Sequence, residues 1–189
     1  MSLHHAIPTP PGHPAPRRGT PVAPRYVQFA ATTCWLGWVR IAATPAGLCA
    51  LLLGDDDDTL LAELRQRFPR ATMAAASPAV QGWAAQIAAW LDDPRAELPL
   101  PLDVHGTPFQ RRVWDVLRTL PPGQTVGYGE LAHRLGMPCA ARAVAQACAA
   151  NPLAVAIPCH RVVSANGSLR GYRWGLARKQ ALLKREAGV

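Results

Sequence analysis

Residues 128–151 read YGELAHRLGMPCAARAVAQACAAN, and this stretch decides how the second half of the chain folds. Two short helical patterns flank Gly136 and Met137, and Pro138 is placed to open the second helix. Two short helices around a glycine turn predict a helix-turn-helix. The second helix is mostly alanine around one long cation, Arg142, so its backbone can approach a groove closely while the guanidinium projects. The alternative is that alanine is simply the best helix former.

A longer helix is predicted just upstream, within GTPFQRRVWDVLRTLPPG at 106–123. Thr107 as N-cap and Gln110 form a capping box, and Pro108 suits the first helical position. Pro121 to Gly123 end the helix. Its predicted buried face consists of Phe109, Val113, Trp114, Leu117 and Leu120.

The first half reads as a small sheet followed by helices. Short apolar runs between Gly and Pro signals predict three strands, at 26–32, 35–43 and 47–53. Four aspartates follow at 55–58. A metal cluster is one interpretation, but their place before TLLAELRQRF favours a helix start, where acidic side chains complement the helix dipole.

Further boundaries follow from composition. Residues 1–24 contain seven prolines without periodicity, which predicts a disordered leader. A second helix at about 78–91 leads into the linker DDPRAELPLPLDVHG, with a domain boundary near residue 103. We therefore expect an N-terminal α/β domain over 25–103 and a C-terminal domain over 104–189.

Charge is divided unequally between these halves. Residues 1–103 have a net charge of −1, whereas residues 104–189 hold 12 Lys/Arg and three Asp/Glu, a net charge of +9. A basic domain joined to a neutral one is typical of a polyanion binder, because each neutralised phosphate releases counterions. Charge that serves only solubility is the alternative.

The five cysteines have no paired spacing, and no signal segment opens the chain, which favours a reducing cytoplasm. No uncharged apolar stretch approaches the roughly 20 residues of a membrane helix, so we expect a soluble protein. Cys139 and Cys148 are expected to be small buried apolar residues. Combining them with Cys159 and His160 in a zinc site fails on spacing, so neither a metal nor a cofactor is expected.

Reactive chemistry is indicated by LAVAIPCHRVV at 153–163. LAVAIP is predicted to be a short buried strand that delivers Cys159, and a neighbouring imidazole or guanidinium would lower the pKa of its thiol. Because adjacent side chains of a strand face opposite ways, a pair between Cys159 and His160 requires a turn or a bridging water, and Pro158 permits either.

A final helix at about 175–187 carries a carboxylate on its apolar face. Glu186 follows Leu182 and Leu183 by four and three residues and so shares their inward face; Leu176 is a further predicted core residue of this helix. A buried carboxylate needs a polar partner, and Glu186 could find one in His160. Glu186 would then orient His160, which would act as the base for the nucleophile Cys159. A cysteine hydrolase would use the same three residue types, but it also needs an oxyanion hole, which the sequence does not reveal.

Six motifs, in this order, resemble the O6-alkylguanine-DNA alkyltransferases: TPFQRRVW at 107–114, YGELA at 128–132, RAV at 142–144, NP at 151–152, PCHRV at 158–162 and GYRWGLARKQALLKRE at 171–186. The resemblance extends from about residue 25 to 187. The chain is especially similar to the carboxy-terminal domain of the bacterial adaptive-response alkyltransferases. The resemblance implies an α+β fold. A ribonuclease H-like α/β domain with a small sheet would precede a mostly helical winged helix-turn-helix domain.

The same resemblance implies direct DNA repair. The alkyl group of O6-alkylguanine would pass irreversibly to Cys159 after base flipping, once per molecule, with O4-alkylthymine as a second candidate substrate. The partner would be double-stranded DNA, bound through the minor groove with little sequence preference by a cytoplasmic monomer. Since a base inside a duplex is shielded, its extrusion costs a few kcal/mol that backbone contacts and an inserted side chain must offset.

Roles for individual residues are likewise implied by the resemblance. His160, Glu186 and a water would polarise the thiol of Cys159, Asn151 would hold the turn around the site, and Tyr128 would donate a proton toward guanine N3. The implied substrate- and DNA-binding residues are Arg142, which would fill the gap left by the flipped nucleotide, Ala141, the carbonyl of Val162, and the loop residues Tyr172, Arg173 and Trp174.

Two departures from the family matter. Many relatives carry small residues where this chain has Arg173 and Trp174, and a bulky indole at the pocket rim should favour methyl over benzyl groups. A proline-rich leader stands where the adaptive-response protein has a four-cysteine zinc module, so we expect no regulation through such a module. Two other classes of protein are alternatives: a lesion sensor, which would lack the cysteine, and a helix-turn-helix regulator, which would leave the Cys/His/Glu set unexplained.

Overall fold

The structure is a computed structural model that describes residues 24–164, 167–169 and 171–188, so the predicted leader lies almost wholly outside the described residues. Its first half holds a four-stranded sheet in the order β3-β2-β1-β4, formed by β1 (Tyr26–Cys34), β2 (Gly37–Thr44), β3 (Gly47–Gly54) and β4 (Thr72–Ala75). Strand β4 runs parallel to β1, and the other neighbours are antiparallel. The three predicted strands are confirmed. Strand β4 was missed because TMAA is short and has no alternating apolar pattern.

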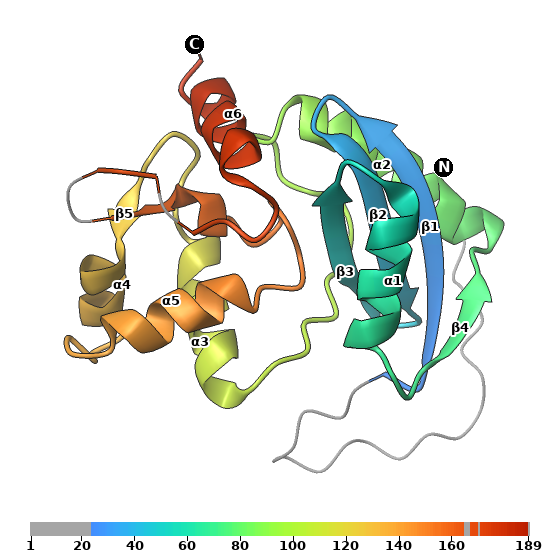
Figure 1. Cartoon of the computed structure of the whole chain (residues 1–189), viewed down its shortest axis with the longest axis horizontal. Helices are drawn as coiled ribbons and strands as arrows, with labels where there is room; N and C mark the ends of the chain where they lie inside the picture. The colour runs from blue at the N-terminus through green and yellow to red at the C-terminus, as the bar shows by residue number, and fades with distance from the viewer. Residues whose placement is uncertain (1–23, 165–166, 170, 189) are drawn as a thin grey trace, which may run out of the picture.

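Two helices cover the faces of this sheet. In Figure 1, α1 (Asp57–Arg67) lies in front of the strands and α2 (Pro78–Asp92) passes behind them, so the central strand β2 is buried along most of its length. Asp56 caps α1 by accepting from the Thr59 backbone N–H at 2.7 Å, and Asp57 pairs with the buried Arg40. The aspartate run is therefore a helix start, as predicted.

The outer edge of β3 joins the two halves of the chain. The Leu51 N–H donates to the Pro152 carbonyl at 2.9 Å, and the Ala154 N–H donates to the Leu51 carbonyl at 2.9 Å. The prediction of a strand over LAVAIP is wrong beyond this bridge. Val155 has a φ of +63°, and the Ile157 N–H bonds back to the Leu153 carbonyl at 3.0 Å, so the chain turns. The run is apolar because it is buried between the halves.

The second half is mostly helical, which makes the whole chain a mixed α+β fold. It contains α3 (Pro108–Arg118), β5 (Val126–Gly127), α4 (Tyr128–Arg134), α5 (Ala141–Ala149), a 3₁₀ turn (Cys159–Arg161), β6 (Val162–Val163) and α6 (Leu176–Glu186). The predicted capping box of Thr107 and Gln110 is confirmed at the start of α3. The Trp114 indole N–H donates to the Ala147 carbonyl at 2.9 Å, which ties α3 to α5.

Three sequence predictions in this half are corrected. Helix α5 begins at Ala141 rather than at Pro138, because the Ala140 N–H bonds to the Met137 carbonyl and closes a turn before the helix. Cys139, predicted to be buried, lies in that turn and is exposed. Leu176 is 48 % exposed, since a residue six positions before Leu182 falls on another face of a helix with 3.6 residues per turn.

Helix α6 lies between the two halves at the top of Figure 1. It buries Lys179, Leu182 and Glu186, which follow one another at spacings of three and four residues. Within residues 24–164, 167–169 and 171–188, none of the helices combines the length and the apolar character needed to cross a membrane.

Candidate active site

Cys159 begins the 3₁₀ turn that follows the bend at Pro158, and only 5 % of its surface is exposed. Its Sγ accepts a hydrogen bond from Asn151 Nδ2 at 3.2 Å. Burial raises the pKa of the thiol to about 11, although Asn151 and the charge of Lys179 oppose the shift. Cys159 therefore rests as a protonated thiol and needs a base before it can act as a nucleophile.

Asn151 holds the chain that leads to Cys159. Its Nδ2 also donates to the Ile157 carbonyl at 2.8 Å, and its Oδ1 accepts from the Leu153 N–H at 2.9 Å. The side chain is fully buried, so one amide closes the turn and contacts the sulfur at the same time.

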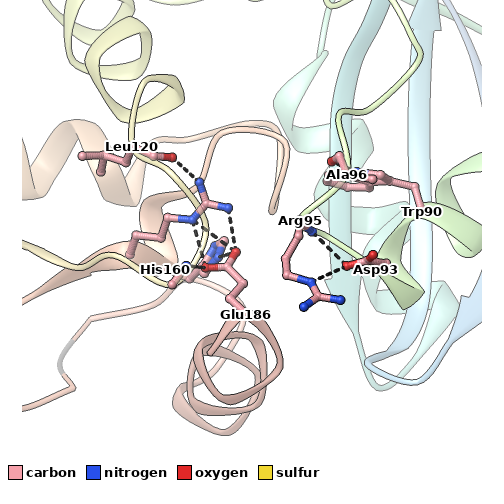
Figure 2. Close-up of polar contacts among 9 residues, drawn as sticks. Trp90, Asp93, Arg95, Ala96, Leu120, His160 and Glu186 are labelled. Carbon is pink, nitrogen blue, oxygen red and sulfur yellow. Dashed lines mark hydrogen bonds and ion pairs between the residues drawn. The ribbon is translucent and has the colours of Figure 1, made fainter. Parts of the chain in front are cut away.

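The buried carboxylate of Glu186 contacts both residues that follow Cys159, His160 and Arg161. His160 Nε2 lies 2.8 Å from Glu186 Oε1, and Arg161 donates to both Glu186 oxygens through Nε, at 3.1 and 3.0 Å, and to Oε1 through Nη2 at 2.7 Å. Arg161 Nη1 also donates to the Leu120 carbonyl, and Glu186 Oε2 accepts from the Gly123 N–H at 3.2 Å. Figure 2 shows the contacts of His160 and of the guanidinium with Glu186, and the contact of the same guanidinium with the Leu120 carbonyl.

This arrangement sets the protonation of the cluster. Burial alone would raise the pKa of Glu186, but the hydrogen bonds from His160 and Arg161 outweigh it and lower the pKa to about 2. Burial lowers the pKa of His160 below 6.5, against the opposing pull of Glu186. Near neutral pH, His160 is therefore a neutral imidazole beside an ionised carboxylate. Its Nδ1 is buried and has no hydrogen-bond partner among the described residues, so it is available as a base.

A pocket of about 290 Å³ opens onto Cys159, at the lower end of the sizes of small-molecule sites, about 300–1,000 Å³. It is lined by Tyr128, Ala145, Cys148, Ala149, Cys159, Gly171, Tyr172 and Arg173. Burial raises the pKa of Tyr128 to about 12, so this phenol keeps its proton. The site thus combines a thiol, a phenol donor and a neutral imidazole around a cavity of limited size.

A larger cavity of about 520 Å³ lies between the halves, but its lining includes Pro158 and Arg161 and not Cys159. Trp90, Arg95 and Ala96 line its first-half side, across from Glu186 in Figure 2. The smaller pocket is therefore the candidate site, because it alone of the two reaches the thiol.

The structure brings some predicted binding residues to this pocket and leaves others outside it. Tyr172 and Arg173 are in its wall, whereas Trp174 is buried behind them, with its ring 5.2 Å from that of Tyr172. The carbonyl of Val162 accepts from Lys179 Nζ at 2.5 Å and is likewise not in the wall. Ala141 and Arg142 form the first turn of α5, where Arg142 is exposed.

Three contributors were missed from the sequence. The sequence predicts a guanidinium near Cys159, but not that this guanidinium, Arg161, pairs with Glu186. Lys179 is fully buried under the site, and its spacing from Leu182 and Glu186 could have revealed this. Cys148, predicted to be a buried filler, is buried but also lines the pocket.

Comparisons with known proteins agree with this geometry. A family profile described as "6-O-methylguanine DNA methyltransferase, DNA binding domain" matches residues 108–188. The bifunctional transcriptional activator/DNA repair enzyme Ada of Escherichia coli K12 is 52 % identical over 161 residues; these are 85 % of this chain and 46 % of that protein, so the chain spans about half of its length.

Two further relatives match this chain over most of their own length. A methylated-DNA--protein-cysteine methyltransferase of Mycolicibacterium paratuberculosis is 43 % identical over 78 % of this chain and 90 % of its own length. The crystal structure of Mycobacterium tuberculosis OGT in complex with DNA superposes with a TM-score of 0.72 at 34 % identity, covering 86 % of this chain and 94 % of that one. The chain therefore belongs to the O6-alkylguanine-DNA alkyltransferases, the family of the methylated-DNA--protein-cysteine methyltransferases.

Proposed function

We propose that this protein repairs O6-alkylguanine in double-stranded DNA by transferring the alkyl group to Cys159. The observation that carries the proposal is that Cys159 lines a pocket of about 290 Å³ and is followed, in the same 3₁₀ turn, by the buried His160, whose Nε2 contacts Glu186. Relatives named methylated-DNA--protein-cysteine methyltransferases and a relative crystallised with DNA support the same reaction. O4-alkylthymine is the second candidate substrate.

The chemistry follows from the protonation states. A water between Cys159 and His160 Nδ1 passes the thiol proton to the neutral imidazole, and Glu186 stabilises the imidazolium that forms. The sulfur attacks the alkyl carbon, the bond from that carbon to guanine O6 breaks, and its electron pair stays on the purine. Tyr128 protonates guanine N3 and regains a proton from His160 through solvent. The thiol proton thus ends on guanine, and the thioether product is stable, so each molecule acts once.

Access to the base requires flipping, and the charge distribution supports it. The second half carries a net charge of +9, and Arg142 projects from the first turn of α5 to fill the space that the base leaves. Ala141 beside it is small enough for close approach to the minor groove. In this proposal α4 and α5 are a helix-turn-helix of a winged domain beginning near residue 104, which follows a ribonuclease H-like sheet domain.

The cellular compartment and the oligomeric state are also part of the proposal. A cytoplasmic monomer would keep Cys159 as a free thiol, because reducing compartments prevent its loss to a disulfide. Val162 and Trp174 would act from behind the pocket wall, through Lys179 and Tyr172 respectively.

The test is the loss of O6-methylguanine from duplex DNA at a known protein concentration. We expect a plateau of one lesion removed per molecule, abolished in Cys159→Ser. Cys148→Ala is the matched control, since Cys148 lines the same pocket and should not accept the alkyl group. A DNA-binding lesion sensor or a regulator would bind the duplex and leave the lesion intact.

A further inference from the structure

A contact from the first half of the chain holds one wall of the pocket. Arg173, which lines the pocket, donates from Nε and Nη2 to Glu63 Oε1 on α1, at 3.0 and 2.7 Å. Its Nη1 donates to the carbonyl of Ala149, another pocket residue at the end of α5, at 3.3 Å. One guanidinium therefore ties α1, α5 and the segment 171–175 together at the mouth of the site.

The segment 171–175 is held by the packing of the buried Tyr172 and Trp174 and by polar contacts of arginines, among them a hydrogen bond of 3.0 Å from Arg178 Nη1 to the Trp174 carbonyl. Gly171 has a φ of +56° and Gly175 a φ of +97°, conformations that glycine adopts readily. The Tyr172 hydroxyl and the Trp174 indole N–H are buried without hydrogen-bond partners among the described residues. The side chain of Arg173 therefore supplies polar anchoring that these two neighbours do not.

The negative charge of Glu63 lies close to two arginines, Arg67 and Arg173. Arg67 approaches the same Glu63 oxygen to 4.0 Å, and the nearby charge of Arg173 contributes, after burial, to lowering the pKa of Arg67. Glu63 therefore separates two cations. Without its charge, Arg67 and Arg173 repel each other, and Arg173 is the one on the segment bounded by glycines.

We infer that Glu63 is a positioning residue for the alkyl pocket: through Arg173 it keeps the segment 171–175 closed against α5 and so limits the size of alkyl group that reaches Cys159. This rests on the proposed function. Glu63 is not part of the pocket wall and acts only through Arg173. The side chains of the pair are 33 % and 27 % exposed, so breaking this ion pair costs little.

The test compares three forms of the full chain with the native protein: Glu63→Gln, which removes the charge, the conservative Glu63→Asp, which keeps it, and Asp57→Asn. Asp57→Asn is the matched control, because it removes an ion pair of the same helix, to Arg40, that does not reach the pocket. Two rates are measured: labelling of Cys159 by iodoacetamide without DNA, and single-turnover transfer from O6-benzylguanine relative to O6-methylguanine in duplexes.

For Glu63→Gln we expect both the labelling rate and the benzyl-to-methyl ratio to rise about two- to fivefold, the factor that breaking a partly exposed ion pair can produce. Glu63→Asp, which keeps a negative charge beside Arg67 and Arg173, should stay closer to native values than Glu63→Gln, and Asp57→Asn should match the native protein. Native values in Glu63→Gln, or an equal rise in Asp57→Asn, would overturn the inference. If the native protein transfers no methyl group, the proposed function fails, and the labelling rate still tests the role of Glu63.

Discussion

At the scale of single residues, the site depends on how Cys159, His160 and Arg161 share one tight turn. The inward position of Glu186 could be predicted from helical spacing, and it is 5 % exposed. The bidentate partner Arg161 could not, because a strand would send neighbouring side chains to opposite faces. The 3₁₀ turn instead directs His160 and Arg161 to the same carboxylate. Arg161 neutralises Glu186, which helps to keep His160 uncharged.

The pH dependence of methyl transfer is predicted from these protonation states. Because the lowered pKa of His160 lies below 6.5, the imidazole is a competent base above that pH and becomes protonated only in acid. The single-turnover rate should therefore be nearly constant between about pH 7 and pH 9 and fall only in acid, as the pH drops through the lowered pKa of His160. Rapid-quench assays on an O6-methylguanine duplex measure this profile.

The contrasting outcome is equally specific. If a pre-existing thiolate were the reactive species, the rate would rise about tenfold per pH unit toward the Cys159 pKa of about 11. Such a rise would contradict the proposed role of His160.

At the scale of elements, short sequence motifs predicted where helices begin, but they did not predict the course of the chain between helices and strands. Thr107 is the N-cap predicted for α3, and the predicted helix start in the aspartate run is confirmed with Asp56 as its cap, since such signals are short-range properties of the sequence. The predicted strand over 153–158 is a turn, because apolar residues indicate burial and do not specify backbone conformation. Strand β4 depends on pairing with β1, a contact that its own residues do not encode.

Helix α5 carries the element-scale prediction. Arg142→Ala should slow methyl transfer from duplex DNA by about tenfold, because no side chain would fill the gap left by the flipped base. Reaction with free O6-methylguanine base should stay at the native rate, since Arg142 is outside the pocket wall. Arg70→Ala, an exposed arginine of the first half, is the control. Equal loss on duplex and free base would contradict this role of Arg142.

At the scale of the whole molecule, the first half supports the site instead of merely preceding it. The edge of β3 pairs with the segment that leads to Cys159, and Arg178 of α6 donates to the Leu36 carbonyl at 2.7 Å. The asymmetry of charge between the halves was visible in composition. These long-range contacts, including that of Glu63 with Arg173, were not, because they join positions more than a hundred residues apart.

The central claim is that Cys159 accepts the alkyl group, and the mass of the protein tests it most directly. After incubation with excess O6-methylguanine duplex, intact-mass analysis should show one added methyl group per chain. Residues 143–161 form one tryptic peptide that contains both Cys148 and Cys159, so fragmentation of this peptide locates the modification. The account predicts a single methyl thioether on Cys159, absent in Cys159→Ser. An unmodified chain, or a methyl group on Cys148, would contradict it.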